Sequence, residues 1–359
     1  MTRNNMCGRI AVLILILVSF GFAWIKTRTY PEPSAFPVIR SEKNGRSSEP
    51  LFKSRFVSNG ITRIVHAPSV VELDYGNLRA FWFAGSREGA GDVEIQSALF
   101  WRGRQSWSTE HTAQTRLSVQ SDLYRAIRKL GNPVAVKDPN GKLWLFFVST
   151  SIGGWSTSSV NMTTSVNDGV TWAPVRRLIS SPFFNLSTLV KTVPFFYRDG
   201  TMGLPIYHEL FSKYGEILHL DMRGNVIEKL RLNDRWRTLQ PLVLFNSKDQ
   251  ALALMRYSDQ QRPRQAIQVV TQDGGQHWSE PIRSMLPNPD SAIAGIALGQ
   301  GRMMVVINNN SVQRDDLTLM YSEDGGHAWQ QVFRFEDQGA FRHSKINSRQ
   351  FTQCIVRLF

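Results

Sequence analysis

The chain has 359 residues, of which 42% are hydrophobic and 11% aromatic, enough for a large core in one all-β domain with a tail. Its formal net charge of +13 indicates acidic partners, such as an anionic sugar or an anionic membrane surface. We expect no nucleic-acid partner, because the basic residues are scattered and form no binding motif. Cys7 and Cys354 lie at opposite ends without a CxxC or Cys/His neighbourhood, so we expect no metal, no cofactor and no disulfide framework.

The first predicted element is an apolar segment near the N-terminus. Residues 10–25 read IAVLILILVSFGFAWI, sixteen residues without a charge, and basic residues flank both ends. No A-x-A-like cleavage site follows, so the pattern predicts a signal-anchor transmembrane helix within residues 1–26, with a cleaved signal peptide as the alternative. Residues 27–55 are rich in proline and serine and are predicted to be an extended linker.

A short motif of the form S/T-x-D/N-x-G-x-x-W then recurs along the chain. It reads SVNDGVTW at 165–172, TQDGGQHW at 271–278 and SEDGGHAW at 322–329, with a worn copy that begins at Asp221. The acidic or amide positions 167, 221, 273 and 324 are 54, 52 and 51 residues apart. An Asp or Asn begins a turn by bonding its own backbone, and about 50 residues make one propeller blade. Residues 56–359 are therefore predicted to form a six-bladed β-propeller whose last blade is atypical or truncated.

Runs of β-forming residues separate these motifs. They are bounded by Gly, Asn or Asp and include Ser69–Leu73, Leu78–Phe83 and Leu143–Val148. No long helix is predicted after the N-terminal segment.

Over about residues 60–335 the chain resembles the sialidase (neuraminidase) family with BNR or Asp-box repeats. The resemblance implies a pocket at the propeller centre. There, three arginines bind the sialic acid carboxylate, an aspartate is the acid/base catalyst, and a tyrosine paired with a glutamate is the nucleophile. It also implies work outside the cytoplasm, so we expect a membrane-anchored propeller on the extracytoplasmic (periplasmic, extracellular or lumenal) side.

Three segments resemble the family's catalytic stretches: Arg87–Asp92, Leu252–Arg256 and Gln313–Leu317. The resemblance implies proton transfer by Asp92, a pocket role for Arg87, and carboxylate binding by Arg256 and Arg314. A guanidinium binds a carboxylate through two parallel hydrogen bonds and stays charged, which suits these two positions. The alternatives are an exposed loop carboxylate for Asp92, a local ion pair for Arg87, and surface roles for the other two arginines.

The chain departs from the family pattern at three places. His66 occupies the position of the first arginine and would be a weaker, pH-dependent ligand for an anion. Gln240 replaces the glutamate, and residues 341–345 contain no tyrosine where the nucleophile is expected. Tyr207 and Tyr257 are the nearest substitutes in the sequence.

The sequence is more similar still to a bacterial branch of sialidase-like Asp-box proteins. In that branch we expect five segments to line or brace one face: His66–Ser69, Asn132–Pro133, Tyr207–Glu209, Gln240–Pro241 and Asn288–Asp290. His208 and Glu209 are interpreted either as a buried, satisfied pair or as a sugar-binding and catalytic pair.

Three functions stay open at this point. The first is an exo-acting retaining glycosidase that hydrolyses terminal sialic acid or a related acidic sugar from glycans. The second, favoured by the missing tyrosine and by Gln240, is a glycan-binding propeller without catalysis. The third is an assembly protein of a surface-polysaccharide system. The missing tyrosine matters because a carboxylate beside the anomeric carbon repels an anionic nucleophile, so a neutral phenol is the usual solution.

Overall fold

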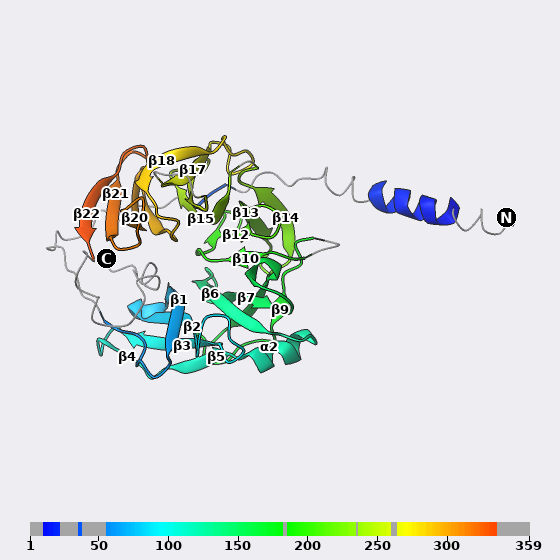
Figure 1. Cartoon of the computed structure of the whole chain (residues 1–359), viewed down its shortest axis with the longest axis horizontal. Helices are drawn as coiled ribbons and strands as arrows, with labels where there is room; N and C mark the ends of the chain where they lie inside the picture. Colours follow the sequence, from blue (N-terminus) through cyan, green and yellow to red (C-terminus); the bar gives the residue numbers. More distant parts are fainter. Residues whose placement is uncertain are drawn as a thin grey trace. The chain divides into compact units, whose positions relative to one another are not determined.

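The computed structural model describes residues 10–21, 35–37, 55–181, 185–234, 236–259 and 264–335. The chain divides into an N-terminal unit, Met1–Ser34, and a second unit, Ala35–Phe359. In the first unit residues 10–21 form a helix whose side chains are all exposed, drawn in blue in Figure 1. Among the described residues, no helix is both long and apolar enough to span a membrane. The rest of the predicted transmembrane segment, residues 1–9 and 22–26, lies outside the described residues, so the anchor stays a prediction.

The second unit is built from five antiparallel sheets that follow one another around a ring in chain order (Figure 1). The first sheet contains β1 (Ile64–Glu72), β2 (Leu78–Gly85), β3 (Glu94–Trp101), β4 (Ser106–Trp107) and β5 (His111–Gln114). The second contains β6 (Lys129–Lys137), β7 (Leu143–Thr150), β8 (Ser159–Ser165) and β9 (Arg176–Arg177). The third contains β10 (Leu189–Val190), β11 (Phe195–Phe196), β12 (Met202–His208), β13 (Tyr214–Leu220) and β14 (Val226–Arg231).

The last two sheets have four strands each. The fourth contains β15 (Thr238–Phe245), β16 (Ala251–Tyr257), β17 (Gln265–Thr271) and β18 (Ile282–Pro287). The fifth contains β19 (Ala294–Gly299), β20 (Arg302–Asn308), β21 (Leu317–Ser322) and β22 (Gln330–Arg334). The helical pieces of this unit are short: η1 (Asp74–Gly76), η2 (Trp155–Thr157) and α2 (Arg116–Leu123).

The all-β propeller prediction is confirmed, but the prediction of six blades was wrong, because the described residues form five. The five sheets already occupy residues 64–334, a little more than 50 residues each. Residues 336–359, which the sequence predicts to belong to an atypical or truncated last blade, lie outside the described part of the chain. Dividing the chain length by a repeat of about 50 residues overestimated the number of described blades, because each described sheet takes more than 50 residues and the first begins only at Ile64.

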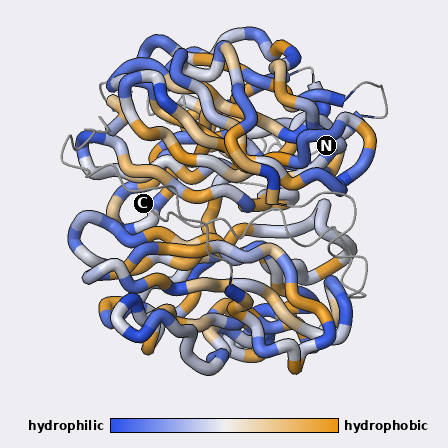
Figure 2. The backbone as a smooth tube through the Cα atoms, turned by 90° about the vertical axis from the view of Figure 1, so that its left-hand side faces the viewer, coloured by the Kyte–Doolittle hydropathy of each residue, from blue (hydrophilic) through white to orange (hydrophobic). Residues whose placement is uncertain are grey.

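The blades pack face to face, which explains why some strands are hydrophobic at every position. Leu143, Leu145 and Phe147 of β7 lie in the core shared with the first blade. The alternate residues Trp144 and Phe146 lie in the core shared with the third blade. Successive side chains of a strand point to opposite faces, so a sheet buried on both faces has no polar alternation. Two further cores join the third blade to the fourth and the fourth to the fifth, and Figure 2 shows the hydrophobic strands lying inside the hydrophilic turns.

The predicted motifs form the expected turns between the third and fourth strands of their blades. In the first, Ser165 Oγ accepts the Gly169 amide at 2.9 Å and Asn167 Oδ1 accepts the Thr171 amide at 2.9 Å. Thr271 and Asp273 make the matching bonds in the second, as do Ser322 and Asp324 in the third. In the worn copy, Asp221 accepts the Asn225 amide at 2.8 Å. Each motif thus closes on its own backbone, which is a purely local event.

Within the stretch predicted as linker, residues 35–37 are fixed on the propeller. Phe36 is 0% exposed and joins the core between the third and fourth blades. Its ring stacks on Tyr197 and Phe245, with centroids 5.7 and 5.2 Å away. Two backbone hydrogen bonds of 2.8 Å, from Phe36 N to Lys248 O and from Arg198 N to Ala35 O, hold the segment on both sides.

Candidate functional site

The motifs with the Asp-box pattern and the predicted site residues lie at opposite ends of the ring. Connections in an antiparallel meander alternate between the two ends of the sheet. The Asp-box turns join third to fourth strands. The predicted residues instead lie on connections between second and third strands, at the starts of first strands or at the end of β16: His66, Arg87, Asp92, Glu209, Gln240, Arg256 and Arg314. All of them therefore lie at the same end of the ring, which we call the site end.

A proline interrupts the first strand of four blades near the site end. In β1, Ala67 and Pro68 together oppose one residue of β2, and Asn132–Pro133 in β6 and Gln240–Pro241 in β15 repeat this bulge. The third blade has a longer interruption, residues 191–194, between β10 and β11, and it ends at Pro194. Proline has no N–H to donate to a sheet, so the ladder breaks there and the strand bends.

The bulges carry unusual backbone conformations. Ala67, Asn132 and Gln240, each before a proline, have φ values of 53°, 46° and 56°. In the fifth blade Asp290, directly after Pro289, has a φ of 63°. Left-handed conformations are costly for residues other than glycine and tend to cluster at functional sites. The positions of these residues therefore indicate a functional site at this end of the ring.

The fourth and fifth blades bring two arginines together at Asp290. Arg256 Nε lies 2.5 Å from Asp290 Oδ1, and the Arg314 guanidinium donates to the main-chain carbonyl of the same residue. The side chains of Arg256 and Asp290 are 22% and 23% exposed, so the pair is half-shielded from water. Charge-assisted hydrogen bonds of this kind fix the direction of a guanidinium. Two cations from different blades are thereby aimed at one place.

Glu209 lies beside this pair on the turn between β12 and β13. Its amide and that of Leu210 both donate to Ser187 Oγ, at 2.7 and 2.9 Å, which fixes the turn. Burial raises the pKa of Glu209, the nearby positive charges of Lys213 and Arg256 act against this, and Asp290 adds to it. A carboxyl group with a raised pKa keeps its proton to a higher pH and is suited to donate it.

Tyr207 connects three blades at the same end. Its hydroxyl accepts long hydrogen bonds from Asn132 Nδ2, at 3.4 Å, and from Gln240 Nε2, at 3.5 Å. The residue is 2% exposed, and burial raises the pKa of its phenol above the usual range. The Oε1 atom of Gln240 is buried with no hydrogen-bond partner among the described residues. A buried acceptor without a partner is costly, so this atom is a candidate ligand contact.

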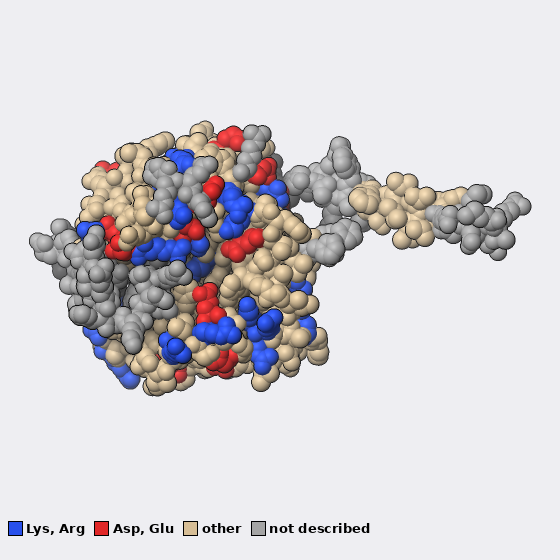
Figure 3. Space-filling model, viewed as in Figure 1, with Lys and Arg blue, Asp and Glu red and all other residues tan. Residues whose placement is uncertain are grey.

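His66, near the start of β1 in the first blade, lies at the same end of the ring. Burial, followed by the positive charges of Lys191 and Arg314, lowers its pKa to about 4. Its Nδ1 atom is buried without a partner among the described residues, and its ring meets Phe83 edge-on with centroids 5.2 Å apart. At neutral pH His66 is therefore an uncharged polar group. Figure 3 shows Lys and Arg side chains interleaved with Asp and Glu side chains around the middle of the face that it presents.

The sequence matches the BNR repeat-like domain family over residues 76–350. The chain belongs to this family. The predicted kinship with sialidase-like BNR repeat proteins is thus confirmed. No curated protein sequence matches this BNR repeat-like domain.

Solved structures show the same fold. The Hadza microbial sialidase Hz136 aligns with a TM-score of 0.65 and 18% identity, over 79% of this chain and 61% of that one. The NanB sialidase from Streptococcus pneumoniae aligns with a TM-score of 0.59 and 10% identity, over 87% and 65%. The intramolecular trans-sialidase from Ruminococcus gnavus aligns with a TM-score of 0.60 and 12% identity, over 77% of this chain and 85% of that one. The chain thus spans less than two thirds of the first two proteins, and at these identities the likeness shows the fold alone.

Two predicted residues of this BNR repeat-like domain, Asp92 and Arg87, are exposed to solvent. Asp92 is exposed and accepts hydrogen bonds from Ser86 N at 3.0 Å and Ser86 Oγ at 2.9 Å. These bonds lower the pKa of Asp92, the opposite of what a proton donor at neutral pH requires. Arg87 is exposed as well, and its charge also acts on Asp92.

His208 and Glu209, which were predicted to form a pair, have different partners. His208 Nε2 lies 2.8 Å from Glu216 Oε2, and its ring stacks on Tyr214 with centroids 4.7 Å apart. Glu209 lies beyond the end of β12, where the charges of Lys213 and Arg256 act on it. His208 therefore braces the strand that leads to Glu209, and the two do not form the predicted pair.

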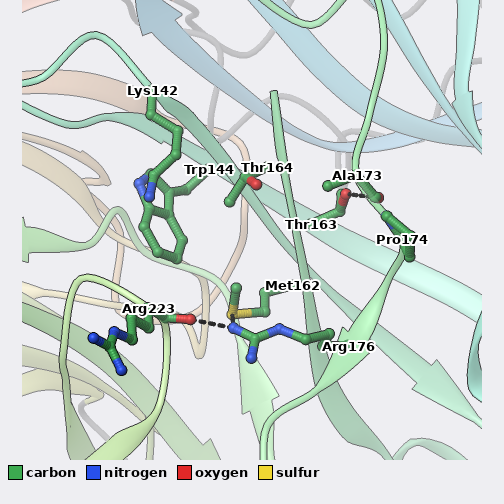
Figure 4. Close-up of a pocket in the computed structure, with 9 residues that line it drawn as sticks. All are labelled: Lys142, Trp144, Met162, Thr163, Thr164, Ala173, Pro174, Arg176 and Arg223. Carbon is green, nitrogen blue, oxygen red and sulfur yellow. Dashed lines mark hydrogen bonds between the residues drawn. The ribbon is translucent and has the colours of Figure 1, made fainter. Parts of the chain in front are cut away.

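Sequence reasoning missed Lys191 and Ser187, which the fold brings to the site end. The one signal for Lys191 was Pro194, which closes the interruption of its strand as the other prolines close theirs. A groove at the other end of the ring, with a volume of about 320 Å³, is separate from this site. It lies between the second and third blades beside Lys142, Trp144 and Arg176, as Figure 4 shows.

Proposed function

We propose that this BNR repeat-like domain is a sialidase-like exo-glycosidase that acts on terminal sialic acid or a related acidic sugar. The observation that carries the proposal is the pair of guanidinium groups of Arg256 and Arg314, which both bond to Asp290, beside the partly buried Glu209. Two oriented guanidinium groups suit a carboxylate, and a protonated carboxyl group suits a glycosidic oxygen. The solved structures with this fold include sialidases and a trans-sialidase, which supports the choice of substrate class.

In the proposed reaction, Arg256 and Arg314 hold the sugar carboxylate, and Glu209 donates its proton to the glycosidic oxygen as the bond to the anomeric carbon breaks. A water molecule then attacks the anomeric carbon and gives a proton to the Glu209 carboxylate, which restores the acid for the next cycle. Direct attack by water requires no protein nucleophile, and Tyr207, at 2% exposure with a raised pKa, is poorly placed to be one. Asp92, the residue implied by family resemblance, is the competing proton donor.

A glycan-binding protein without catalysis is the second candidate. It is favoured by the amide of Gln240, which stands where the family has a glutamate and contacts a buried tyrosine. An amide cannot accept the proton of a phenol as a carboxylate does. In this case the arginines would retain the ligand and Glu209 would only contact it.

Turnover separates the two candidates. The full chain is incubated with fluorogenic sialosides and with a panel of fluorogenic uronic-acid glycosides, beside Glu209→Gln, Asp92→Asn and Arg256→Ala. Hydrolysis that is lost in Glu209→Gln and retained in Asp92→Asn supports the proposal. Glycan binding that disappears in Arg256→Ala, with no turnover of any substrate by the unaltered chain, establishes the second candidate instead.

We propose, in addition, that the N-terminal segment anchors the chain in a membrane with the propeller on the extracytoplasmic side. The support is an uncharged run over residues 10–25 and a helix over residues 10–21 that exposes apolar side chains all round, including Leu15, Leu17 and Phe20. A helix that is hydrophobic on every side suits a lipid environment. Extraction of the chain from membranes by alkaline carbonate, or protection of the propeller from protease in right-side-out vesicles, would contradict this.

A further inference from the structure

The proposed anion site lacks one charge that its family pattern provides. Family resemblance places an arginine where this chain has His66. That residue is mostly buried, and Nδ1 has no partner among the described residues. A neutral imidazole can donate a hydrogen bond to an anion but brings no positive charge to it.

A lysine occupies the corresponding interruption of the third blade. Lys191 directly follows β10, the first strand of its sheet, and opens the four-residue segment that Pro194 closes. The interruptions of the first, second and fourth blades begin at Ala67, directly after His66, at Asn132 and at Gln240, so Lys191 belongs to the same set of segments. Its backbone is held on both sides, because Val190 is 0% exposed and the Thr192 hydroxyl donates to the Pro241 carbonyl.

The charge of Lys191 reaches the site. Among the charged groups that act on His66, Lys191 has a larger effect than Arg314, so both cations lie near the same imidazole. Arg314 in turn shares Asp290 with Arg256. Lys191 of the third blade and Arg314 of the fifth thus both act on His66, and Arg314 meets Arg256 of the fourth blade at Asp290. Lys191 itself is half-buried, where water screens its charge less.

We propose that Lys191 is the third cation of the anion site. It supplies the positive charge that is missing because His66 stands at the position of the family's arginine. The inference rests on the proposed function, since it assigns a further residue to the same site. Lysine presents a single compact ammonium group, whereas arginine presents a planar guanidinium that can form two parallel hydrogen bonds. Lys191 would therefore attract the carboxylate by its charge without fixing its orientation. The site would then hold a sugar carboxylate by two guanidinium groups and one ammonium.

The test is calorimetric titration of the full chain with N-acetylneuraminic acid and with its methyl ester. Lys191→Met removes the charge but keeps most of the length, and we expect it to weaken binding of the acid about 10- to 100-fold. Lys191→Arg should bind within about 3-fold of the unaltered chain, because the charge returns. Binding of the uncharged ester should be the same in all variants. The matched control is Lys248→Met, which removes an equally charged, exposed lysine from the other end of the ring.

Two further measurements distinguish a ligand from a structural residue. The double variant His66→Arg/Lys191→Met should recover acid binding to within about 5-fold, because it restores a cation at the family position. The pKa of His66, followed by NMR, should rise in Lys191→Met, even if that variant is less stable. A structural role for Lys191 predicts no rescue by the arginine.

The outcomes also separate this proposal from the proposed function. If Arg256→Ala abolishes acid binding while Lys191→Met binds as tightly as the unaltered chain, Lys191 is not part of the site and the proposed function stands. If the unaltered chain binds the acid no better than the ester, both proposals fall together.

Discussion

Arg256 and Asp290, which are 34 residues apart in the chain, lie with Nε and Oδ1 2.5 Å from each other. The same aspartate accepts a hydrogen bond from Arg314 through its main-chain carbonyl. Asp290 is therefore the residue that joins two arginines of different blades in the proposed anion site, and its φ of 63° is part of that geometry.

Substitution of Asp290 by asparagine should weaken acid-sugar binding, although it raises the net charge by one. The charge-assisted hydrogen bond that orients Arg256 is lost. The arginine side chain must then be ordered when the ligand binds, and the lost side-chain entropy makes the binding free energy less favourable. We expect a loss of about 10-fold, close to 1.4 kcal/mol, in calorimetric titration. Asp234→Asn is the control, because it removes an exposed carboxylate that pairs with Arg231 and adds the same charge. Tighter binding in Asp290→Asn would mean that charge alone governs the site.

Glu209 should set the alkaline limit of activity. Since burial raises its pKa, the proton is held to a higher pH than the usual value of about 4.3, and the rate should fall as pH rises through the shifted pKa. Glu209→Gln should remove most of the activity across the pH range. Asp92→Asn should keep the same pH profile, because hydrogen bonds from Ser86 lower the pKa of Asp92 and leave it ionised at neutral pH. A profile that changes in Asp92→Asn but not in Glu209→Gln would reverse the two roles.

His66 should make stability depend on pH in mildly acid solution. Burial and the charges of Lys191 and Arg314 lower its pKa to about 4, whereas the unfolded value is near 6.5. Between these values the unfolded state binds a proton that the folded state does not, so stability rises with pH from about 4 to 6.5 and is constant above. Over this range the titration of His66 changes the free energy of unfolding by about 3 kcal/mol at most. Urea unfolding at pH 4.5 and 7 should show a smaller difference in His66→Leu, whereas the exposed His111→Leu should behave like the unaltered chain.

Phe36 should contribute strongly to the stability of the propeller. Its ring is 0% exposed and contacts aromatic residues of two blades, so Phe36→Ala leaves a cavity and should cost about 3–5 kcal/mol in denaturant unfolding. Phe211→Ala is the matched control, because Phe211 is 97% exposed and its loss should change stability by less than about 0.5 kcal/mol. Equal unfolding midpoints for the two variants would show that the segment around Phe36 does not hold the blades together.

The fold class could be predicted from the sequence because its signals are local. Asn167, Asp273 and Asp324 close their turns on amides four residues ahead, so the recurring motif predicts the blade corner wherever the rest of the chain lies. The unbroken hydrophobic run of β7 likewise predicts a strand buried on both faces. The number of blades is not local, because it depends on how much of the chain enters the ring, and the sequence-based estimate was one too high.

The composition of the site was decided by the tertiary structure. Sequence resemblance singled out Arg256, Arg314, Glu209 and the segment Asn288–Asp290, but only the ring brings Arg256 and Arg314 from different blades to the same aspartate. Whether a carboxyl group keeps its proton depends on burial and neighbouring charges, which sequence spacing does not encode. For that reason Asp92 and Glu209 could not be ranked from the sequence, and packing raised the pKa of Glu209, the less exposed of the two.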